Sequence, residues 1–366
     1  MRIAVDARPL SVPIVGIGRY TLNLLEQMLF QDEDDTWYLY SDKPLIFEFG
    51  ERKKVRVRTG RVKNRLMSLV WSQIVFSFWA RKDRIDLFWS PRHHLPVLLP
   101  SEVKKVVSIH DLVWCYFPKT MMWQNRFLER LLMPISLKMA DRIISVSKST
   151  ANDLTGNFRG IEHKINVIPE AASMMDNLDI DSTVDQPYLL FVGTLEPRKN
   201  LKRLLRAFRK VIDNGIREYA LIIAGGQGWS RDSLESVVED LSLEKSVKVL
   251  GYVEDKTLHS LYRNAYAVVL PSLYEGFGLP LLEAMQYGTP VISANVSSMP
   301  EIVGDAGILV DPLSVEEISA AMIKLLSDRV LREKLSERSI EQASRYSWKD
   351  SAMKTHDLFR ALTEEQ

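Results

Sequence analysis

Short apolar runs alternate with longer amphipathic stretches along the whole chain. In the first half, the runs that predict β-strands are residues 2–6, 37–41, 54–58, 87–90, 106–110, 142–146 and 165–168. Apolar residues repeat with helical spacing between several of these runs, which predicts helices at residues 19–30, 64–80 and 124–139. Alternation of this kind is typical of a mostly parallel sheet that helices cover on both faces.

The same alternation restarts near residue 188. Strands are predicted at residues 188–192, 220–224, 247–250, 267–270, 290–293 and 308–310. Helices are predicted at residues 201–214, 230–241, 258–263, 280–287, 315–327 and 328–345. Between the two series, residues 171–186 are polar and have neither period, so we expect a linker there. A last helix, from Trp348 to about Leu362, has no strand after it.

Two doubly wound domains of an α/β fold are the natural interpretation. We place the first domain at residues 1–170, the linker at 171–186 and the second domain at 187–345, and we expect residues 346–366 to pack back on the first domain. Ligands of such sheets bind at the carboxyl ends of the strands. We therefore expect the two domains to face each other across a cleft.

Composition places the chain among ordinary globular proteins, because its 366 residues are 46% hydrophobic and 26% charged. The single cysteine, Cys115, excludes an internal disulfide bond, and no cysteine–histidine group has the spacing of a structural zinc site. No apolar run approaches the roughly 20 residues of a membrane span, and the first residues open a strand rather than a signal peptide. We therefore expect a cytoplasmic protein.

Charge divides the chain more sharply than composition does. Through Glu170 there are 26 lysines and arginines against 18 acidic residues, whereas the remainder has 22 against 29. Within residues 51–84, eleven basic residues accompany a helix rich in tryptophan and phenylalanine. Such a segment either lies on an anionic surface, here the inner face of the plasma membrane, or is a partly buried helix beside a solvated basic face. No module that binds nucleic acid is recognisable.

The most informative motif begins at Glu275 and ends at Glu283, between an apolar strand and a helix. The turn after the first glutamate consists of Gly276, Phe277, Gly278 and Leu279. Glycine permits close backbone approach, and the N–H groups at a helix N-terminus attract anions. Two carboxylates would repel a phosphate alone, so we interpret them as acceptors for sugar hydroxyls that flank a diphosphate. The alternative is a Gly-Pro turn with two solvated glutamates.

Two adjacent cations, Arg198 and Lys199, follow the strand at residues 188–192. A lysine point charge and an arginine fork suit a diphosphate leaving group. Taken alone, the pair would be interpreted as a basic turn that pairs with Glu196. The glycines within residues 224–228 mark another strand exit, but they lack the full dinucleotide-binding spacing.

The first domain contains two further candidate features. Gly16 and Gly18 precede a helix, but Thr21 stands where a dinucleotide fingerprint has its third glycine, so the motif indicates a phosphate-approaching loop rather than an NAD site. His110 stands at the carboxyl end of a strand, where a histidine is either functional or a satisfied structural residue.

Neither of two acidic segments has the context of a metal site. Asp179 and Asp181 form an Asp-x-Asp pair inside the expected linker, and residues 32–35 form a polar turn after a helix. We expect solvated carboxylates at both places, and therefore no metal and no cofactor.

Together these segments resemble the retaining glycosyltransferases of family 4, which have the GT-B fold of two Rossmann-like domains. The resemblance covers nearly the whole chain, and its most specific element is the Glu-x7-Glu signature of Glu275 and Glu283. Residues 192–200, His110-Asp111, residues 16–20, residues 288–295 and residues 299–303 support it. Several segments look most like bacterial mannosyltransferases of O-antigen or exopolysaccharide assembly.

The resemblance implies a role for each candidate residue. Glu275 would meet the donor sugar, Glu283 the nucleotide ribose and the residue 276–279 amides the sugar and phosphates. Lys199 and Arg198 would neutralise the diphosphate. The remaining contacts would be His110 to the sugar, Gly16 and Gly18 to the phosphates, and Tyr252 and Val253 to the base.

One departure from the family pattern concerns the phosphate charge. Thr194 stands where many relatives have an arginine. The charge must then rest on Lys199 and Arg198, or the donor differs.

The implied reaction is metal-independent transfer of a hexose, with retention, from a nucleotide diphosphate sugar to a saccharide. GDP-mannose is the preferred donor, ahead of GDP-rhamnose and UDP-hexoses, and a polyprenyl-diphosphate-linked acceptor would explain the basic, aromatic first domain. The alternatives are a sugar-nucleotide epimerase or a phosphorylase of the same architecture, and a non-catalytic partner subunit.

Overall fold

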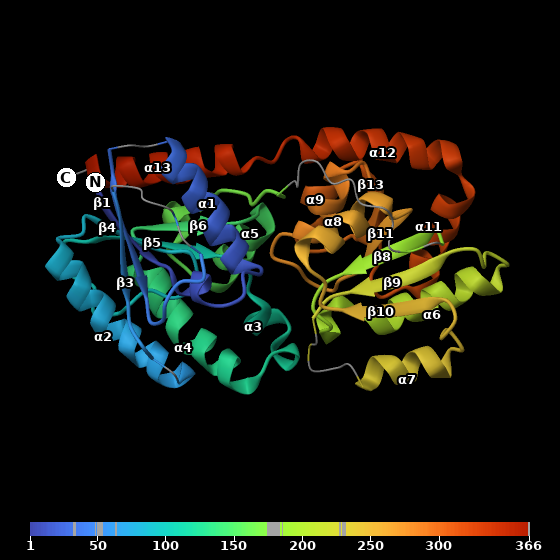
Figure 1. Cartoon of the computed structure of the whole chain (residues 1–366), viewed down its shortest axis with the longest axis horizontal. Coiled ribbons are helices and arrows are strands. Elements are labelled where there is room, and N and C mark those ends of the chain that lie inside the picture. Colours follow the sequence, from blue (N-terminus) through green and yellow to red (C-terminus); the bar gives the residue numbers. More distant parts are fainter. Residues whose placement is uncertain are drawn as a thin grey trace. The chain divides into compact units, whose positions relative to one another are not determined.

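The computed structural model describes residues 1–31, 34–47, 49, 54–62, 64–173, 184, 186–226, 228 and 232–364. The chain divides into two compact units, shown with their elements labelled in Figure 1. The first consists of Met1–Glu170 with Ser347–Gln366, and the second of Ala171–Tyr346. Most of the expected linker, the acidic residues Asp32 and Glu33, and the Asp179–Asp181 pair lie outside the described residues.

The first unit is built on a parallel sheet with the strand order β3-β2-β1-β4-β5-β6-β7. Its strands are β1 (Arg2–Asp6), β2 (Thr36–Ser41), β3 (Val55–Thr59), β4 (Leu87–Ser90), β5 (Lys104–Ile109), β6 (Arg142–Ser145) and β7 (Ile165–Val167). Its helices are η1 (Arg8–Ser11), α1 (Ile17–Gln31), α2 (Arg65–Asp83), α3 (Val113–Tyr116), η2 (Pro118–Thr120), α4 (Trp123–Met139), α5 (Lys148–Asn157), η3 (Glu162–Lys164) and α13 (Trp348–Glu364).

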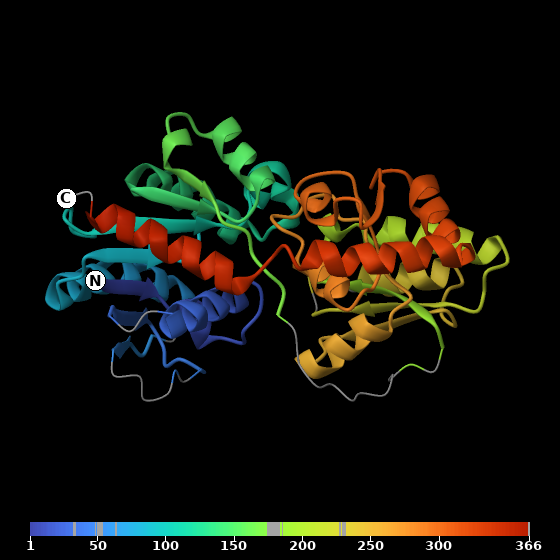
Figure 2. The ribbon, with the colours of Figure 1, turned by 90° about the horizontal axis from the view of Figure 1, so that it is seen from above.

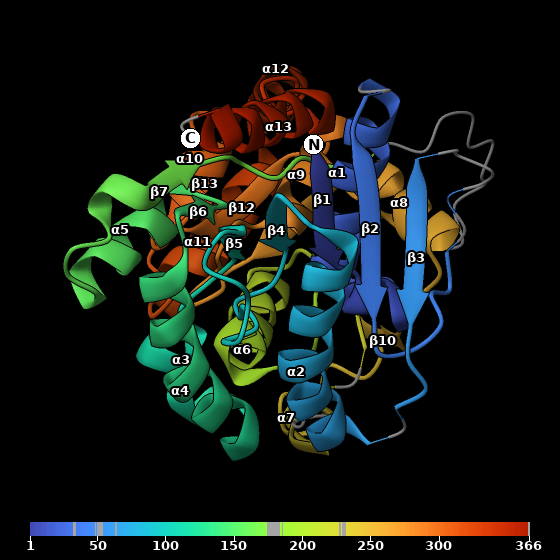
Figure 3. The ribbon, with the colours of Figure 1, turned by 90° about the vertical axis from the view of Figure 1, so that its left-hand side faces the viewer.

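Helices cover both faces of this sheet. Phe76 of α2 and Met133 of α4 belong to one buried cluster with strand residues such as Phe88. Helices α1 and α13 pack against each other on the opposite face (Figures 2 and 3). There the ring centroid of Trp89 lies 5.8 Å from that of Phe359, so the C-terminal helix is part of the core of the first unit.

The second unit repeats this plan with the parallel order β10-β9-β8-β11-β12-β13. Its strands are β8 (Tyr188–Val192), β9 (Ala220–Ala224), β10 (Val247–Gly251), β11 (Ala267–Leu270), β12 (Val291–Ala294) and β13 (Gly307–Val310). Its helices are η4 (Pro197–Lys199), α6 (Leu201–Asp213), α7 (Asp232–Asp240), α8 (Asp255–Asn264), α9 (Leu279–Gln286), α10 (Met299–Val303), α11 (Val315–Ser327) and α12 (Arg329–Ala343). Both sheets are doubly wound, which confirms the predicted fold class.

Among the described helices that the sequence did not predict, α5 is longer than α3 and α10. Only Thr150 and Leu154 are buried in it, so its apolar periodicity is too sparse to recognise. A cap supports it instead, because the Ser147 hydroxyl accepts a hydrogen bond from the Thr150 amide at 3.0 Å.

Candidate functional site

The charged candidates of the second unit meet at the carboxyl ends of two neighbouring strands. Lys199 and Arg198 lie in η4, after β8, and Glu275 lies in the loop after β11, which pairs with β8. Lys199 Nζ donates to Glu275 Oε1 at 2.5 Å, and Arg198 Nη1 donates to Glu275 Oε2 at 2.9 Å. Each oxygen of one carboxylate therefore holds a different cation.

The backbone joins the same two loops. Arg198 Nη1 also donates to the Tyr274 carbonyl at 3.0 Å, and the Leu273 amide donates to the Arg198 carbonyl at 2.8 Å. Asn200 has a left-handed φ of 62°, and its side chain donates to the carbonyl of Pro271 at 2.9 Å. The cluster is thus held by tertiary contacts and not by one flexible turn.

The cluster is buried, and its electrostatics follow from that. Burial acts to raise the pKa of Glu275, but the charges of Lys199 and Arg198 outweigh it and lower the pKa to about 2. Burial lowers the pKa of Lys199, and the charge of Glu275 opposes this effect. A lysine ammonium has three N–H groups, and among the described residues Lys199 uses one, on Glu275. The others remain free to donate.

Glycines that the sequence analysis left aside bring the strand exits together. A Cβ atom on Gly225 would lie 2.0 Å from the carbonyl oxygen of Gly193, and one on Gly228 would lie 2.0 Å from that of Leu195. A Cβ atom on Gly193 would lie 3.2 Å from Lys199 Cε. The glycines within residues 224–228 therefore allow the loops beneath Lys199 to pack closely. A search for dinucleotide-binding motifs would not reveal this role.

Glu283 lies on α9. The hydroxyl of Tyr262, on α8, donates a hydrogen bond to Glu283 Oε2 at 2.7 Å. Before α9, Gly278 has a φ of 108° and precedes the helix without a side-chain cap. In the first turn, Pro280 has no N–H group, and the Leu281 amide donates to the Gly278 carbonyl at 2.9 Å. The carbonyls of Glu275 and Phe277 accept hydrogen bonds from Ser298 Oγ at 3.0 and 2.8 Å. Tyr262 and Ser298 are site residues that sequence reasoning missed, because each is distant in sequence from the motif it supports.

Tyr252 and Val253 lie farther along the same edge of the sheet. They follow β10, which is separated from β8 by β9. The Tyr252 side chain is 66% exposed. The structure therefore gathers residues 198–199, 275–279 and 283, and sets residues 252–253 apart from them.

His110 is held on every side in the first unit. Its Nδ1 lies 2.9 Å from Glu170 Oε1 and its Nε2 lies 2.9 Å from the Pro91 carbonyl, while the ring of Tyr20 stands edge-on at 4.6 Å. Both ring nitrogens of His110 are therefore engaged by groups of the first unit, which fixes the orientation of the ring.

A second histidine group fixes the His110 backbone. The His110 amide donates to His93 Nε2 at 3.1 Å, and the Glu129 carboxylate lies 3.3 Å from His93 Nδ1 and 3.1 Å from His94 Nε2. Burial acts to raise the pKa of Glu129, but His93 and His94 outweigh it and hold the pKa well below its usual range. The sequence offered no role for this pair of histidines, because Glu129 stands on a helix far along the chain.

Gly16 and Gly18 open α1. Gly16 has a left-handed φ of 46°, and a Cβ atom on Gly18 would lie 3.1 Å from the Pro9 carbonyl oxygen. Within the described part of the chain, no group of three or more histidine, cysteine, aspartate or glutamate residues could hold a metal ion. In the same residues, no helix is both long and apolar enough to cross a bilayer.

Comparison with known proteins decides the family. A model described as Glycosyltransferase Family 4 matches residues 14–172, and one described as Glycosyl transferases group 1 matches residues 179–342. The O-antigen chain mannosyltransferase B of Escherichia coli is 32% identical over 388 aligned positions, covering 99% of this chain and 100% of that protein. The chain belongs to glycosyltransferase family 4.

Solved structures agree with this fold. Sucrose-phosphate synthase from Thermosynechococcus elongatus superposes with a TM-score of 0.80 at 20% identity, over 100% of both chains. HepE from Anabaena, in complex with UDP and glucose, superposes with a TM-score of 0.73 at 17% identity, over 99% of this chain and 100% of that one. This family 4 glycosyltransferase therefore has the two Rossmann-like domains of the GT-B fold, and one relative that it matches over the full length is an O-antigen mannosyltransferase.

Proposed function

We propose that this glycosyltransferase moves mannose from GDP-mannose to a saccharide acceptor in bacterial surface polysaccharide synthesis, with retention and without a metal ion. The observation that carries the proposal is the buried cluster of Lys199, Arg198 and Glu275 at the joined ends of β8 and β11. The full-length similarity to an O-antigen mannosyltransferase supports the sugar and the pathway. The nucleotide sugar is supported by the relative whose structure contains UDP and glucose.

The chemistry follows from where charge develops. Cleavage leaves a negative diphosphate and an oxocarbenium-like sugar, and preorganised donors at the leaving oxygen lower that barrier. In the proposal, the free N–H groups of Lys199 and the amides of residues 276–279 bind the diphosphate. Glu275 accepts from the sugar hydroxyls and Glu283 from the ribose, while Tyr252 and Val253 contact the base. The acceptor attacks the face from which the diphosphate departs, which retains the anomeric configuration.

The proposal also gives roles to residues of the first unit. Gly16 and Gly18 contact the phosphates, and His110 contacts the sugar. Because Glu170 and Pro91 engage both nitrogens of the His110 ring, we expect this histidine to keep a fixed orientation beside the sugar rather than to act as a base.

The test uses the full chain and measures donor binding separately from the transfer reaction. Thermal melting with GDP, UDP and ADP should show the largest shift with GDP, since a ligand of the native state raises the melting temperature. With GDP-mannose and a mannobiose that carries a hydrophobic aglycone, proton NMR should show a new α-linkage, with and without EDTA. A β-linkage, a need for metal, or a larger shift with UDP would each refute that part of the proposal. Conversion of the sugar without acceptor would indicate an epimerase instead.

A lipid-linked acceptor is supported by the outer faces of two helices. On α2, Met67, Val70, Ile74 and Phe78 recur with helical spacing and are between 55% and 63% exposed. On α4, Trp123, Phe127, Leu131 and Ile135 do the same and are between 38% and 74% exposed. We call these eight residues the apolar face. Large apolar patches of this kind mark interaction sites.

The charges around the apolar face are of one sign. Among the side chains that the structure describes on α2 and α4, the exposed ionised ones are Arg81, Lys82, Arg126, Arg130 and Lys138. The acidic side chains turn inward, with Asp83 paired to Arg58 and Glu129 to the histidines. An apolar stripe edged by cations suits the headgroup region of an anionic bilayer. Residues 51–53 and 63 of the basic segment lie outside the described residues.

Vesicle flotation tests the apolar face. The chain should float with vesicles of phosphatidylglycerol and not with phosphatidylcholine alone, and the pair Phe78→Ser and Phe127→Ser should abolish flotation. Val330→Ser is the matched control, because Val330 is 75% exposed on α12 of the other unit. Flotation that survives the double substitution would show that another surface binds the membrane.

A further inference from the structure

Two buried histidines follow neighbouring strands of the first unit. His93 lies in the loop after β4, and His110 directly follows β5, which pairs with β4. Both residues are at most 9% exposed, and their ring centroids lie 5.8 Å apart. The proposed function uses His110 and gives His93 no part in the reaction.

The His93 ring has one hydrogen-bond partner at each nitrogen. Nε2 lies 3.1 Å from the amide nitrogen of His110, and a backbone amide only donates. Nδ1 lies 3.3 Å from Glu129 Oε2, and an ionised carboxylate only accepts. Together these partners require a neutral imidazole with its proton on Nδ1. The backbone of His110 is therefore held by a ring that is able to take up a second proton.

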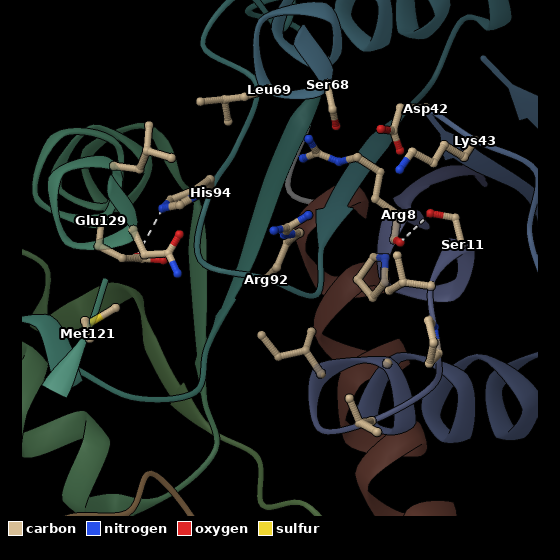
Figure 4. Close-up of a pocket in the computed structure, with 18 residues that line it drawn as sticks. Arg8, Ser11, Asp42, Lys43, Ser68, Leu69, Arg92, His94, Met121 and Glu129 are labelled. Atoms are coloured by element: carbon tan, nitrogen blue, oxygen red, sulfur yellow. Dashed lines mark hydrogen bonds and ion pairs between the residues drawn. The ribbon is translucent and has the colours of Figure 1, made fainter. Parts of the chain in front are cut away.

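Glu129 connects this buried ring to solvent. Its Oε2 also lies 3.1 Å from His94 Nε2, the contact that a dashed line marks in Figure 4. Glu129 and His94 line a pocket of about 540 Å³ within the first unit. That volume is many times the roughly 30 Å³ share of one water molecule, so water can reach the carboxylate. His93 can then exchange a proton without unfolding of the unit.

The charges around His93 favour that second proton. Burial acts to lower the pKa of His93, but the charge and hydrogen bond of Glu129 outweigh it and raise the pKa above its usual 6.5. Asp111, which follows β5, adds to the rise, and Arg92, on the same loop as His93, opposes it. Glu129 itself stays ionised, because its pKa lies well below its usual range.

The two hydrogen bonds of His93 therefore make opposite demands. A proton on Nε2 would face the His110 N–H group across 3.1 Å, and two donors cannot bond to each other. The same proton would strengthen the pair with Glu129. The other titratable neighbours do not take over the amide, because His94 shares Glu129 and the His110 ring engages Glu170.

We propose that His93 is a positioning residue for sugar transfer: its neutral ring holds the His110 backbone, and its protonation releases that backbone and lowers turnover. The proposal rests on the proposed function, in which His110 contacts the sugar. A displacement of about 1 Å at a reacting centre is enough to slow a reaction by about 10²-fold.

The pH dependence of turnover, measured with GDP-mannose and mannobiose from about pH 5.5 to about pH 8.5, tests the full chain. The kcat should fall on the acid side with a midpoint above pH 6.5. At about pH 8, His93→Leu should lower kcat by about 10- to 100-fold. His93→Gln keeps an uncharged acceptor, so it should recover part of that loss and should lack the acid-side fall. His163→Gln is the matched control, because His163 is an exposed histidine of the same unit, and it should leave the profile unchanged.

Glu129→Gln shifts the same profile. It removes the charge that favours a protonated His93, so the midpoint should move to lower pH by about one unit or more. Glu102→Gln, on an exposed carboxylate of the first unit, should leave the midpoint in place. An unshifted midpoint in Glu129→Gln, or an equal acid-side fall in His93→Gln and the unmodified chain, would assign the titration to another group and overturn the proposal.

Nitrogen-15 NMR of the histidine-labelled chain tests the link between the two residues without turnover. At about pH 8, the ring signal that disappears in His93→Gln should be that of an imidazole with a proton on Nδ1 and an unprotonated Nε2. On acidification, the amide signal of His110 should move with the midpoint of the His93 ring. A proton on Nε2 at about pH 8, or an amide signal that ignores the titration, would refute the proposal.

These outcomes separate the two proposals. GDP affinity should be equal in all variants, since GDP lacks the sugar that His110 is proposed to contact. If no form of the chain turns over GDP-mannose, the donor assignment is wrong, and the NMR titration still decides whether His93 controls the His110 backbone. If turnover occurs and its pH profile ignores residue 93, the positioning role alone is wrong.

Discussion

The charged side chains at the strand ends are paired differently in the two units. In the second unit, Lys199 and Arg198 converge on the single carboxylate of Glu275, and the lysine keeps N–H groups to spare. In the first unit, the buried Arg8 pairs with Asp6, and its Nη1 donates to Ser72 Oγ at 2.7 Å. On the same doubly wound scaffold, one strand end thus keeps N–H groups on a buried lysine, and the other pairs its buried arginine within the unit.

The largest effect should come from Lys199→Ala. If the lysine supplies a preorganised donor to the leaving diphosphate, turnover should fall by roughly 10²–10³. Steady-state release of GDP from GDP-mannose measures this. Lys202→Ala, on an exposed position of the next helix, is the control and should keep full turnover. Near-normal turnover of a folded Lys199→Ala protein would mean that the N–H groups of Lys199 do not stabilise the leaving diphosphate. The contrast drawn between the two units would then not hold.

Acid should weaken the second unit through Glu275. Its pKa is lowered from 4.5 to about 2 in the fold, so the stabilisation is fully present above pH 4.5 and is lost as pH falls toward 2. The loss attributable to this group is about 3 kcal/mol. Denaturant unfolding between pH 5 and pH 2 measures it, with Glu275→Gln as the comparison. The variant should start less stable, because Lys199 is left without its partner, and should depend less steeply on pH. If the free energy of unfolding had the same pH dependence in both proteins, Lys199 and Arg198 would not be keeping the Glu275 carboxylate ionised.

The smallest effect concerns the packing beneath the cations. Gly225→Ala should lower the free energy of unfolding by about 2 kcal/mol, because its Cβ atom would meet the Gly193 carbonyl at 2.0 Å. Gly226→Ala is a close control, since nothing lies within 4 Å of the added atom. Thermal melting of both variants provides the measurement. Equal melting temperatures of the two variants would show that the two loops can move apart without destabilising the fold.

Much of the architecture could be predicted from the chain itself. Periodicity placed the strands 2–6, 87–90, 188–192, 220–224 and 267–270 at their observed bounds, because a buried parallel strand is a short apolar run whatever surrounds it. It missed α5, whose polar surface and two buried residues leave almost no pattern. Local motifs also pointed to Glu275, Glu283 and the Arg198–Lys199 pair, which the structure collects at one end of a sheet.

The sequence by itself determined which residues form the elements and which turns carry charge or glycine, because these depend on neighbours a few positions away. Only the tertiary structure decided what each charge faces. It joined Lys199 to Glu275, His110 to Glu170 and Arg8 to Ser72. These outcomes depend on which strand exits become neighbours in a sheet. Such pairings join residues 60 or more positions apart, as in His110 with Glu170, and no local pattern encodes them.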